Sequence, residues 1–541
     1  MRSSNSAPEP GADPLAPLQQ LADWLASTTT HVLLGVLIGL LVARVMRSRH
    51  LHWSWAAAAL TFVLFPGHAL ASSTLISTPA VAALSATAWS RRWHREDIEA
   101  GGDLAEIATG RRGPLDVLRI TARRLRLTRP QLRACARAQA GQLILGHDEN
   151  HRVVSIPFGG ETGGTHTLVV GATGSGKTVT QTWVAVNAVE RGMGCVVVDP
   201  KGDQAMRTQL GRAARAAGRP FIEWSPAGPS VYNPLARGSE TEVADKALAG
   251  EHFTEPHYLR QAQRYLGHVV RTLRGAGHEV SLRRIVQHMD PERLECLARR
   301  LPEAEASATH DYLDSLSARQ QSDLAGVRDR LAILAESDAG AWLDPQTPSV
   351  ERFDLLEAVH ARAVVYFSLE SDRRPLLTQM LGAAIVQDLQ TIVAALQGRP
   401  LPTLVVIDEF SAIAAAQVVR LFGRARSAGF SLLLCAQELS DLRLPGRERL
   451  LEQVLGNLSV LVAHRQVVPD SARLIASLAG RRGAWRTSRR SDGGVTRTRV
   501  SEDVLDSTDV VRLGTGWAAV IVLSGGGGVR FARILSASRR R

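Results

Sequence analysis

The sequence His166-Thr-Leu-Val-Val-Gly171-Ala-Thr-Gly-Ser-Gly-Lys177-Thr178 decides the fold. It joins a short apolar run, typical of a buried strand, to the pattern G-x-x-x-x-G-K followed by Ser or Thr. A helical stretch, Val179 to Glu190, comes next. In this strand, loop and helix context, glycines let the backbone N–H groups of the loop turn inward on phosphates. The stretch therefore predicts a P-loop nucleotide site in a RecA-like α/β fold.

Each residue of this loop has an expected role in binding ATP. Lys177 would reach the β- and γ-phosphate oxygens, and the Thr178 hydroxyl would coordinate Mg²⁺. The other nucleotide-binding positions are Gly171, Ala172, Thr173, Gly174, Ser175 and Gly176. The chain has only three lysines, Lys177, Lys201 and Lys246, and two of them lie near this loop, where a compact ammonium suits phosphate. A glycine-rich turn without a ligand is the alternative interpretation.

A second apolar run ends in two carboxylates, Leu404-Val-Val-Ile407-Asp408-Glu409. Parallel α/β folds bind ligands at the carboxyl ends of their strands, so both carboxylates are expected beside the phosphate loop. Asp408 would hold Mg²⁺, through water, and Glu409 would orient and deprotonate the attacking water. Together the two motifs predict an ATP hydrolase that uses ATP and Mg²⁺.

Two further elements favour a hydrolytic motor over a kinase. Gln437 follows the strand expected at residues 431–435, where its amide could sense the γ-phosphate or the water. Arg424 and Arg426 lie in the turn Gly423-Arg-Ala-Arg-Ser-Ala-Gly429 and are expected to be exposed enough to reach a neighbouring subunit. Ordinary surface arginines are the alternative interpretation of this pair.

From about residue 143, short apolar runs alternate with helical stretches, which predicts a parallel α/β sheet. The expected strands are residues 167–170, 195–198, 363–368, 404–407, 431–435 and 459–462, with a terminal hairpin of 516–523 and 529–534. The strand pattern disappears between Glu242 and Leu343, which predicts an all-helical inserted domain. The expected division is 143–240 for the first half of the core, 241–345 for the insertion and 346–541 for the second half.

The N-terminal part is expected to anchor the chain in a membrane. Residues 24–43 contain no Asp, Glu, Lys or Arg, and about 20 such residues span a bilayer. A second uncharged stretch, 53–90, holds one long span or two short ones and ends at a basic collar with aromatic residues. The expected division is an extramembrane tail at 1–27, two or three transmembrane helices at 28–91 and a basic connector at 92–142. With two spans or with three, the residues after 91 are expected to face the cytoplasm, and the chain is expected to be a multi-pass inner-membrane protein.

The charge balance favours a polyanionic partner. Lys and Arg number 64 against 52 Asp and Glu, and both nucleic acid and anionic lipid fit this excess. Two arginine-rich segments are candidate DNA contacts, 119–137 in the connector and 481–499 around Trp485; a solvated helix and a disordered basic loop are the respective alternatives. Four cysteines lie far apart without a C-x-x-C pair, so the sequence suggests neither a zinc site nor a disulfide framework.

Taken in order, these motifs resemble the TraG/VirD4 family of type IV coupling proteins, within the wider FtsK/HerA group of hexameric motors. The resemblance covers roughly residues 150–535 and the membrane anchor. Its most telling pieces are the phosphate loop, Val198-Asp-Pro-Lys-Gly-Asp203, Ile407-Asp-Glu-Phe410, the turn Gly423 to Gly429, and Ala436-Gln437. In that family the Arg eleven residues before the Gln acts as a finger in trans, which selects Arg426 (437 minus 426 is 11). Asp199 and Lys201 are implied only to support the site.

The resemblance implies a membrane-anchored, ATP-driven DNA translocase that delivers relaxase-bound, single-stranded conjugative DNA to a transfer or secretion channel as a homo-hexamer. It also implies that residues 408–442 recognise the relaxosome or transfer apparatus and that the helical insertion lies at the DNA-entry side of the ring. The span number and the insertion depart from the family pattern. A double-stranded DNA translocase of FtsK type, a nucleotide-switched docking receptor for DNA–protein cargo and a secretion motor for protein effectors remain alternatives.

Overall fold

The computed structural model describes residues 28–49, 51, 53–59, 73–99, 114, 118, 121, 141–159, 164–251, 253, 255–348, 351–413, 415–443, 449–489, 495–524 and 528–537. They fall into two units. The smaller comprises Met1–Arg129 with Arg482–Glu502, and the larger comprises Pro130–Arg481 with Asp503–Arg541. The candidate nucleotide-binding residues all belong to the larger unit.

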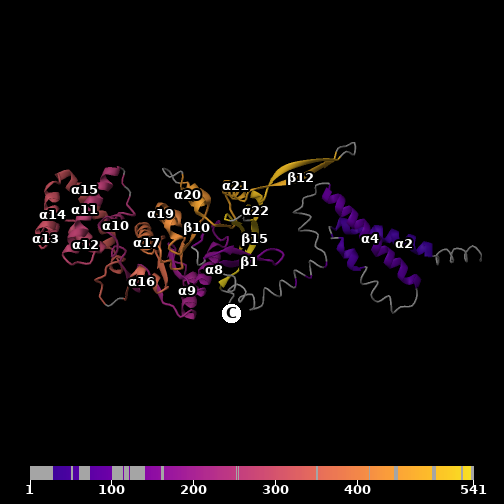
Figure 1. The fold of residues 1–541 in the computed structure, drawn as a ribbon, viewed down its shortest axis with the longest axis horizontal. Helices are drawn as coiled ribbons and strands as arrows, with labels where there is room; N and C mark the ends of the chain where they lie inside the picture. The colour runs from indigo at the N-terminus through magenta and orange to yellow at the C-terminus, as the bar shows by residue number, and fades with distance from the viewer. Residues whose placement is uncertain are drawn as a thin grey trace, which may run out of the picture. The chain divides into compact units, whose positions relative to one another are not determined.

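The larger unit is built on an eleven-stranded sheet (Figure 1), in the order β2-β1-β15-β14-β11-β3-β10-β9-β4-β8-β5. Seven of these strands run parallel to one another: β11 (Val460–Ala463), β3 (His166–Val170), β10 (Phe430–Ala436), β9 (Thr403–Ile407), β4 (Gly194–Asp199), β8 (Val364–Ser368) and β5 (Phe221–Trp224). Four antiparallel strands extend the sheet beyond β11: β14 (Trp517–Val522), β15 (Val529–Ile534), β1 (Gln142–His147) and β2 (Val153–Pro157).

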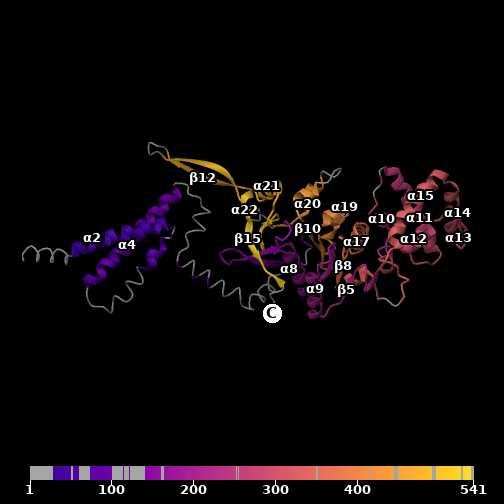
Figure 2. The same ribbon diagram turned by 180° about the vertical axis from the view of Figure 1, so that it is seen from behind.

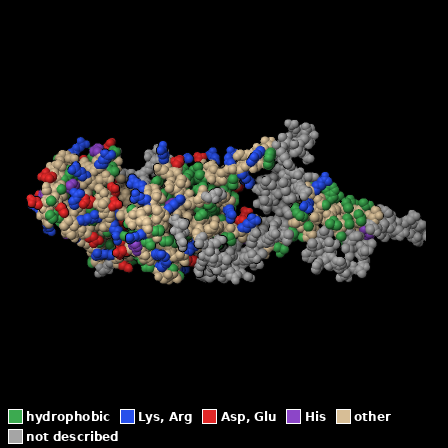
Figure 3. All heavy atoms as spheres, in the orientation of Figure 1, with side chains coloured by type: hydrophobic (Ala, Val, Ile, Leu, Met, Phe, Trp, Pro, Cys, Tyr) green, Lys and Arg blue, Asp and Glu red, His purple; other side chains and the backbone are tan. Residues whose placement is uncertain are grey.

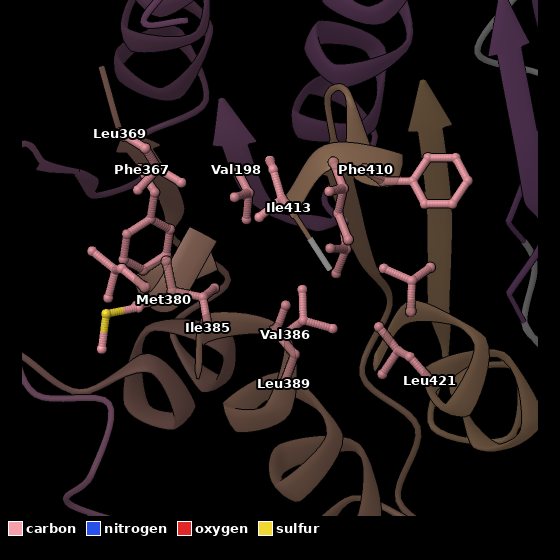
Figure 4. Packing of buried hydrophobic residues seen from close by; sticks show 14 of the residues in the cluster. Val198, Phe367, Leu369, Met380, Ile385, Val386, Leu389, Phe410, Ile413 and Leu421 are labelled. Atoms are coloured by element: carbon pink, nitrogen blue, oxygen red, sulfur yellow. The ribbon is translucent and has the colours of Figure 1, made fainter. Parts of the chain in front are cut away.

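Helices cover both faces of the parallel strands, which explains why these strands are apolar along their length. On one face, α8 (Lys177–Glu190) and α9 (Gln204–Ala216) pack on side chains such as Cys195 and Val197; Figure 2 shows α9 beside β5 and β8. On the other face, α17 (Pro375–Ala395) and α19 (Ala415–Ala425) pack on alternate residues. Figure 4 shows this second layer, including Val198 and Phe367 of the sheet and Ile385, Val386 and Leu389 of α17.

The predicted α/β P-loop fold is confirmed, and each expected strand lies within one residue of an observed strand at its start and within one at its end. The sequence missed β1, β2 and β5, and it missed a small parallel pair formed by β6 (Ser230–Tyr232) and β7 (Glu351–Phe353). These strands are short, as β5, β6 and β7 are, or lie at or next to the edge of the sheet, as β2 and β1 do, with buried positions interrupted by partly exposed ones. A continuous apolar run is therefore a poor guide to them.

Among the described residues between β6 and β7 there are six α-helices, and Figure 1 shows them gathered beside the sheet of the same unit. They are α10 (Glu240–Ala247), α11 (Pro256–Gly275), α12 (Leu282–His288), α13 (Pro291–Ala298), α14 (Glu303–Asp314) and α15 (Ala318–Ala335). The longest, α11, buries one apolar stripe that includes Leu266, Val269, Val270 and Leu273. This spacing is that of an amphipathic helix with one face on the core.

A buried ion pair joins the first of these helices to the core. Lys246 Nζ of α10 donates to Asp388 Oδ1 of α17 at 2.6 Å and to the Arg237 carbonyl oxygen at 2.9 Å. The other Asp388 oxygen, Oδ2, accepts from the Tyr232 hydroxyl at 2.8 Å. The Lys246 and Asp388 side chains are only 1% and 4% exposed, so each charge depends on the other for compensation.

Replacement of Lys246 by Met is therefore expected to lower the free energy of unfolding by about 3–5 kcal/mol, because it leaves the buried Asp388 charge without its partner. Chemical denaturation of the full chain in detergent would measure this loss. A matched double variant, Lys246→Met with Asp388→Leu, should recover most of it, since no uncompensated charge then remains. Equal stability of the single variant and the wild type would show that the pair does not hold α10 against α17.

The smaller unit contains two long helices, α2 (Thr28–Ser48) and α4 (Ser73–Glu99), which pack against each other. Two glycines of α2 permit the close approach: a Cβ on Gly39 would lie 1.9 Å from Ser85 Oγ, and one on Gly35 would lie 2.8 Å from the Thr78 carbonyl oxygen. Small residues spaced by four positions are typical of helix pairs in membranes. Residues 60–72, which decide between two and three spans, lie outside the described residues.

The outer surface of α2 is strongly apolar. Residues Thr29–Ser48 form a helix long and apolar enough to cross a membrane, and Figure 3 shows hydrophobic side chains gathered over α2 and α4. Those of α2 that are exposed are Val32, Leu33, Leu34, Leu37, Ile38, Leu41, Val42 and Val45. A second helix of comparable length and apolar character, Pro375–Ala395, is the core helix α17, and 72% of its most apolar stretch is buried.

The basic segment around Trp485 differs from the loop expected from its sequence. It forms a two-stranded sheet of β12 (Arg481–Arg489) and β13 (Val495–Asp503), whose base is joined by an ion pair of 3.2 Å between Arg481 and Asp503. The Trp485 side chain is 67% exposed. The arginines expected to contact DNA in the connector, 119–137, lie outside the described residues.

Candidate nucleotide-binding and hydrolysis site

The phosphate loop lies between the carboxyl end of β3 and the start of α8. Gly174 and Gly176 have φ values of 73° and 116°, in the left-handed region that glycine adopts without a Cβ clash. Neighbouring strands hold the loop in place: Gly171 N–H donates to the Gln437 carbonyl oxygen at 3.1 Å, and Ala172 N–H donates to the Arg465 carbonyl oxygen at 2.9 Å. The loop conformation is therefore set by the sheet as well as by its own glycines.

Lys177 is the first residue of α8, and its ammonium folds back over the loop. Its Nζ donates to the Gly171 carbonyl oxygen and, at 3.4 Å, to that of Ala172. Burial lowers the pKa of Lys177 below its ordinary value, although the nearby Asp408 carboxylate opposes this shift. A partly desolvated cation held over an open loop is well suited to bind an anion such as a phosphate group.

Asp408 and Glu409 follow β9, which is separated from β3 only by β10. Asp408 Oδ1 accepts from Gln181 Nε2 of α8 at 2.7 Å, which fixes the carboxylate beside the helix that begins with Lys177. Burial raises the pKa of Asp408, and the neighbouring Asp199 and Glu409 carboxylates raise it further. A bound cation would offset this crowding of negative charge.

Glu409 is held by two donors to the same oxygen. Its Oε1 accepts from Lys201 Nζ and, at 2.8 Å, from Gln437 Nε2. Burial alone would raise the pKa of Glu409, but these hydrogen bonds and the charges of Lys201 and Lys177 lower it below its ordinary value. Its backbone φ is 43°, a conformation that L-residues with a side chain adopt rarely and that is common at functional sites.

Asp199 fixes the loop that carries Lys201. The Asp199 carboxylate accepts from the backbone N–H groups of Lys201, Gly202 and Asp203 at 2.8, 3.0 and 2.6 Å, and it also accepts from the Tyr366 hydroxyl. Asp199 ends β4, the strand next to β9. The carboxylate therefore positions the Lys201 backbone beside Glu409 without entering the phosphate loop itself.

His464 is a buried residue under the phosphate loop that the sequence did not single out. It follows β11, with Nε2 bonded to Thr180 Oγ1 at 2.8 Å and Nδ1 bonded to the Trp517 carbonyl oxygen at 3.0 Å. Burial lowers the pKa of His464 to about 4, so its ring is neutral at physiological pH. The one signal for His464 in the sequence is its place just after the strand expected at 459–462, because residues at the carboxyl ends of parallel strands lie at the ligand-binding side of the sheet.

Arg426 lies at the amino ends of the parallel strands, opposite the carboxyl ends that carry the phosphate loop. It precedes β10, while Gln437 follows it, and seven strand residues place the two edges roughly 20 Å apart. Arg426 Nη2 donates to the Asn457 carbonyl oxygen at 2.8 Å and to Ser459 Oγ at 3.3 Å. Arg426 also lies near His166, the first residue of β3: burial and then the Arg426 charge lower the pKa of His166 to about 3. Arg426 therefore cannot reach the phosphate loop of its own chain.

Thus Lys177, Asp408, Glu409 and Gln437 lie together at the carboxyl ends of the parallel strands. Arg426 lies at the amino ends of the same strands. The remaining loop residues, from Gly171 to Gly176 and Thr178, line the same carboxyl edge. Lys201, which the sequence placed only in a supporting role, is in direct contact with Glu409.

Comparison with known proteins gives three findings. A family model described as the type IV secretion-system coupling protein DNA-binding domain matches residues 150–507. The type 4 coupling protein DotL of Legionella pneumophila is 42% identical over 55 residues, which are 10% of this chain and only 7% of DotL.

The third finding is structural. The unbound bacterial conjugative coupling protein TrwB has a TM-score of 0.58 at 18% identity, over 76% of this chain and 93% of that chain. TrwB in complex with ADP and Mg²⁺ has a TM-score of 0.54 at 19% identity, over 69% of this chain and 85% of that chain. At these identities the likeness shows the fold.

Proposed function

Since the chain belongs to the family of type IV secretion-system coupling proteins, we propose that it hydrolyses ATP to deliver conjugative DNA to a transfer or secretion channel. The observation that carries the proposal is the meeting of Lys177, Asp408, Glu409 and Gln437 at one sheet edge beside the phosphate loop. A binding module would need the loop and its lysine, whereas the paired carboxylates with a polar partner are what hydrolysis needs in addition.

ATP is the proposed substrate. The backbone N–H groups of Gly171, Ala172, Thr173, Gly174, Ser175 and Gly176 would surround the phosphates, and Lys177 would leave its carbonyl partners to neutralise them. TrwB, which shares this fold, has been captured with ATP and GTP analogues and with ADP and Mg²⁺. These nucleotide complexes support the choice of a nucleoside triphosphate.

Mg²⁺ is the proposed metal, and the Thr178 hydroxyl and the Asp408 carboxylate would hold it. A hydroxyl and a carboxylate are the hard oxygen ligands that Mg²⁺ prefers, and the raised pKa of the crowded Asp408 carboxylate supports a site that favours a cation. Bound there, Mg²⁺ would supply positive charge that neutralises the phosphate oxygens as charge develops on them.

Glu409 is the proposed general base. Its carboxylate would orient a water molecule and accept its proton as the water oxygen attacks the γ-phosphorus, and Gln437 would hold the carboxylate or the water in line. Arg426 is the proposed cation in trans. Since it lies far from its own phosphate loop, it would stabilise the transition state in an adjoining subunit, which supports a homo-oligomer, proposed to be a hexamer.

The remaining assignments follow from the family and the N-terminal helices. We propose an inner-membrane protein with its transmembrane helices within 28–91, a connector at 92–142 and a cytoplasmic core whose halves, 143–240 and 346–541, flank the insertion 241–345. The exposed apolar side chains of α2 support the anchor. DNA, expected to be single-stranded and carried by a relaxase, and the proteins of the channel are the proposed partners.

The test is ATP hydrolysis by the full chain, purified in detergent and reconstituted in lipid, with no DNA, with single-stranded DNA and with double-stranded DNA. We expect single-stranded DNA to stimulate turnover the most, and the effect to weaken steeply as salt rises. Stimulation by double-stranded DNA alone would instead favour a translocase of FtsK type. Nucleotide binding without turnover in every condition would contradict the proposal and favour a docking receptor.

A further inference from the structure

Lys201 occupies an unusual position for a residue that only supports the site. Its ammonium pairs directly with Glu409, the residue proposed to activate water, although its side chain is 48% exposed while that of Glu409 is 18% exposed. Lys201 and Lys177 lie near the same carboxylates: burial, with the Lys201 charge, lowers the pKa of Lys177, whereas burial of Lys201 is outweighed by the hydrogen bond to Glu409 and the nearby carboxylates, which raise the pKa of Lys201. Two ammonium groups therefore face the place where the terminal phosphate is expected to bind.

The pairing occupies the Glu409 oxygen that would otherwise be open to water. Lys201 and Gln437 both donate to Oε1, so a water molecule that approaches this oxygen meets two donors already in place. The charged groups facing Glu409 are Lys201, Lys177 and Asp408. Movement of the Lys201 side chain would open Oε1 to water while the main chain stays in place.

The surroundings of Lys201 permit such a movement. Asp199 binds three successive N–H groups of the Lys201 loop, so the backbone is fixed, but the lysine side chain has four methylene groups and a half-exposed end. Rotation of the Lys201 side chain alone is therefore enough to carry its ammonium from Glu409 to an anion bound nearby. The chain has three lysines against many arginines. The compact ammonium of a lysine exchanges partners more easily than the bidentate guanidinium of an arginine.

We propose that Lys201 is a nucleotide-sensing positioning residue. Its ammonium pairs with Glu409 while no γ-phosphate is present and moves from Glu409 to the γ-phosphate when ATP binds. Glu409 is then free to bind the attacking water. ADP, which lacks the γ-phosphate, leaves Lys201 on Glu409. The inference rests on the proposed ATPase function, and it adds that the nucleotide itself releases the catalytic carboxylate.

The small number of lysines makes the transfer directly measurable. The full chain labelled with ¹³C at the lysine ε-carbons should give three NMR signals, which the variants Lys201→Arg and Lys177→Arg assign. Lys177 reports nucleotide binding, and Lys246, buried against Asp388, is an internal reference. We expect a non-hydrolysable ATP analogue with Mg²⁺ to shift both Lys177 and Lys201, and ADP with Mg²⁺ to shift Lys177 alone.

A second variant shows which partner Lys201 has in each state. Glu409→Gln should move the Lys201 signal in the nucleotide-free protein, because the ion-pair partner is gone. With the analogue bound, wild type and Glu409→Gln should give the same Lys201 signal, since the ammonium then lies on phosphate in both. A bound-state signal that still depends on Glu409 would overturn the inference. A Lys177 signal that no nucleotide moves would overturn the proposed function as well, and so the two failures are distinguishable.

Affinity gives an independent readout. Lys201→Met should bind the ATP analogue roughly twofold to fivefold more weakly, the range for one half-exposed charge contact, and should bind ADP almost unchanged. Lys201→Arg should retain part of the discrimination. The matched control is Arg207→Met on α9, which breaks a similarly exposed ion pair with Glu223 of β5 (41% and 20% exposed). Equal weakening of analogue and ADP by Lys201→Met would indicate a merely structural role and contradict the inference.

Discussion

Replacement of Glu409 by Gln is expected to lower kcat for ATP hydrolysis by about 100- to 10,000-fold, the usual contribution of a general base. The substitution keeps the shape of the side chain and its capacity to accept from Gln437, but an amide cannot accept the proton of the attacking water. Binding of nucleotide should persist, because the phosphate loop and Lys177 are intact. Steady-state hydrolysis and equilibrium binding, measured on the same preparation, would separate the two effects.

A nearby carboxylate provides the control. Glu438→Gln removes a charge next to Gln437. The half-buried Glu438 carboxylate accepts from Ser440, and Glu438 is the capping residue of the short helix Leu439–Leu442, so its replacement by the isosteric amide should leave basal hydrolysis within about twofold of wild type. DNA transfer in cells should be lost with hydrolysis in Glu409→Gln. Transfer that survives in this variant would show that turnover is not required and would favour a receptor that uses nucleotide as a switch.

Removal of the Arg426 guanidinium is expected to have a still larger effect, with a diagnostic pattern in mixtures of variants. Arg426→Ala should lower hydrolysis by about 1,000- to 100,000-fold, the range for a cation supplied in trans, as should Lys177→Ala. Each variant should be inactive alone. When the two variants are mixed, an interface between the loop of an Arg426→Ala subunit and the arginine of a Lys177→Ala subunit is complete, so activity should return.

Two controls show whether a loss of activity in Arg426→Ala reflects misfolding or a general effect of arginine removal. Because Arg426 also bonds to Asn457 and Ser459, the thermal unfolding midpoint of the variant must remain close to that of wild type. Arg424→Ala, which removes the other arginine of the same turn, should retain most of the activity and serves as the matched control. Failure of the mixture to regain activity, with both variants folded and oligomeric, would contradict an action of Arg426 across subunits.

The fold could be predicted because its central strands are buried on both faces. β4, β9 and β10 consist almost entirely of apolar residues, so each appears in the sequence as an uninterrupted run between helical stretches. The antiparallel edge was harder. β1 and β2 contain exposed or half-exposed positions, and the β12–β13 hairpin is rich in Arg, Ser and Thr, a composition that indicates a loop as readily as a strand.

The candidate site could be predicted in part for a related reason. Asp408 and Gln437 each follow a parallel strand, and the rule that such strands end at a common edge is enough to bring them to the phosphate loop. The partners of these residues could not be predicted. The Lys201–Glu409 contact depends on β4 lying next to β9, and the His464–Thr180 contact depends on β11 lying next to β3. Strand order of this kind is not encoded in any local pattern.

The order in which the chain is synthesised bears on when it can become active. The phosphate loop is supported by residues that lie far downstream: His464 from below, and Gly516, whose N–H donates to the Ser175 carbonyl oxygen at 2.9 Å. The apolar helices near the N-terminus leave the ribosome hundreds of residues earlier. Under the proposed function, a nascent chain would therefore enter the bilayer while its nucleotide pocket is still unfinished, and hydrolysis of ATP would begin only after translation has passed Gly516 and the last strands have joined the sheet.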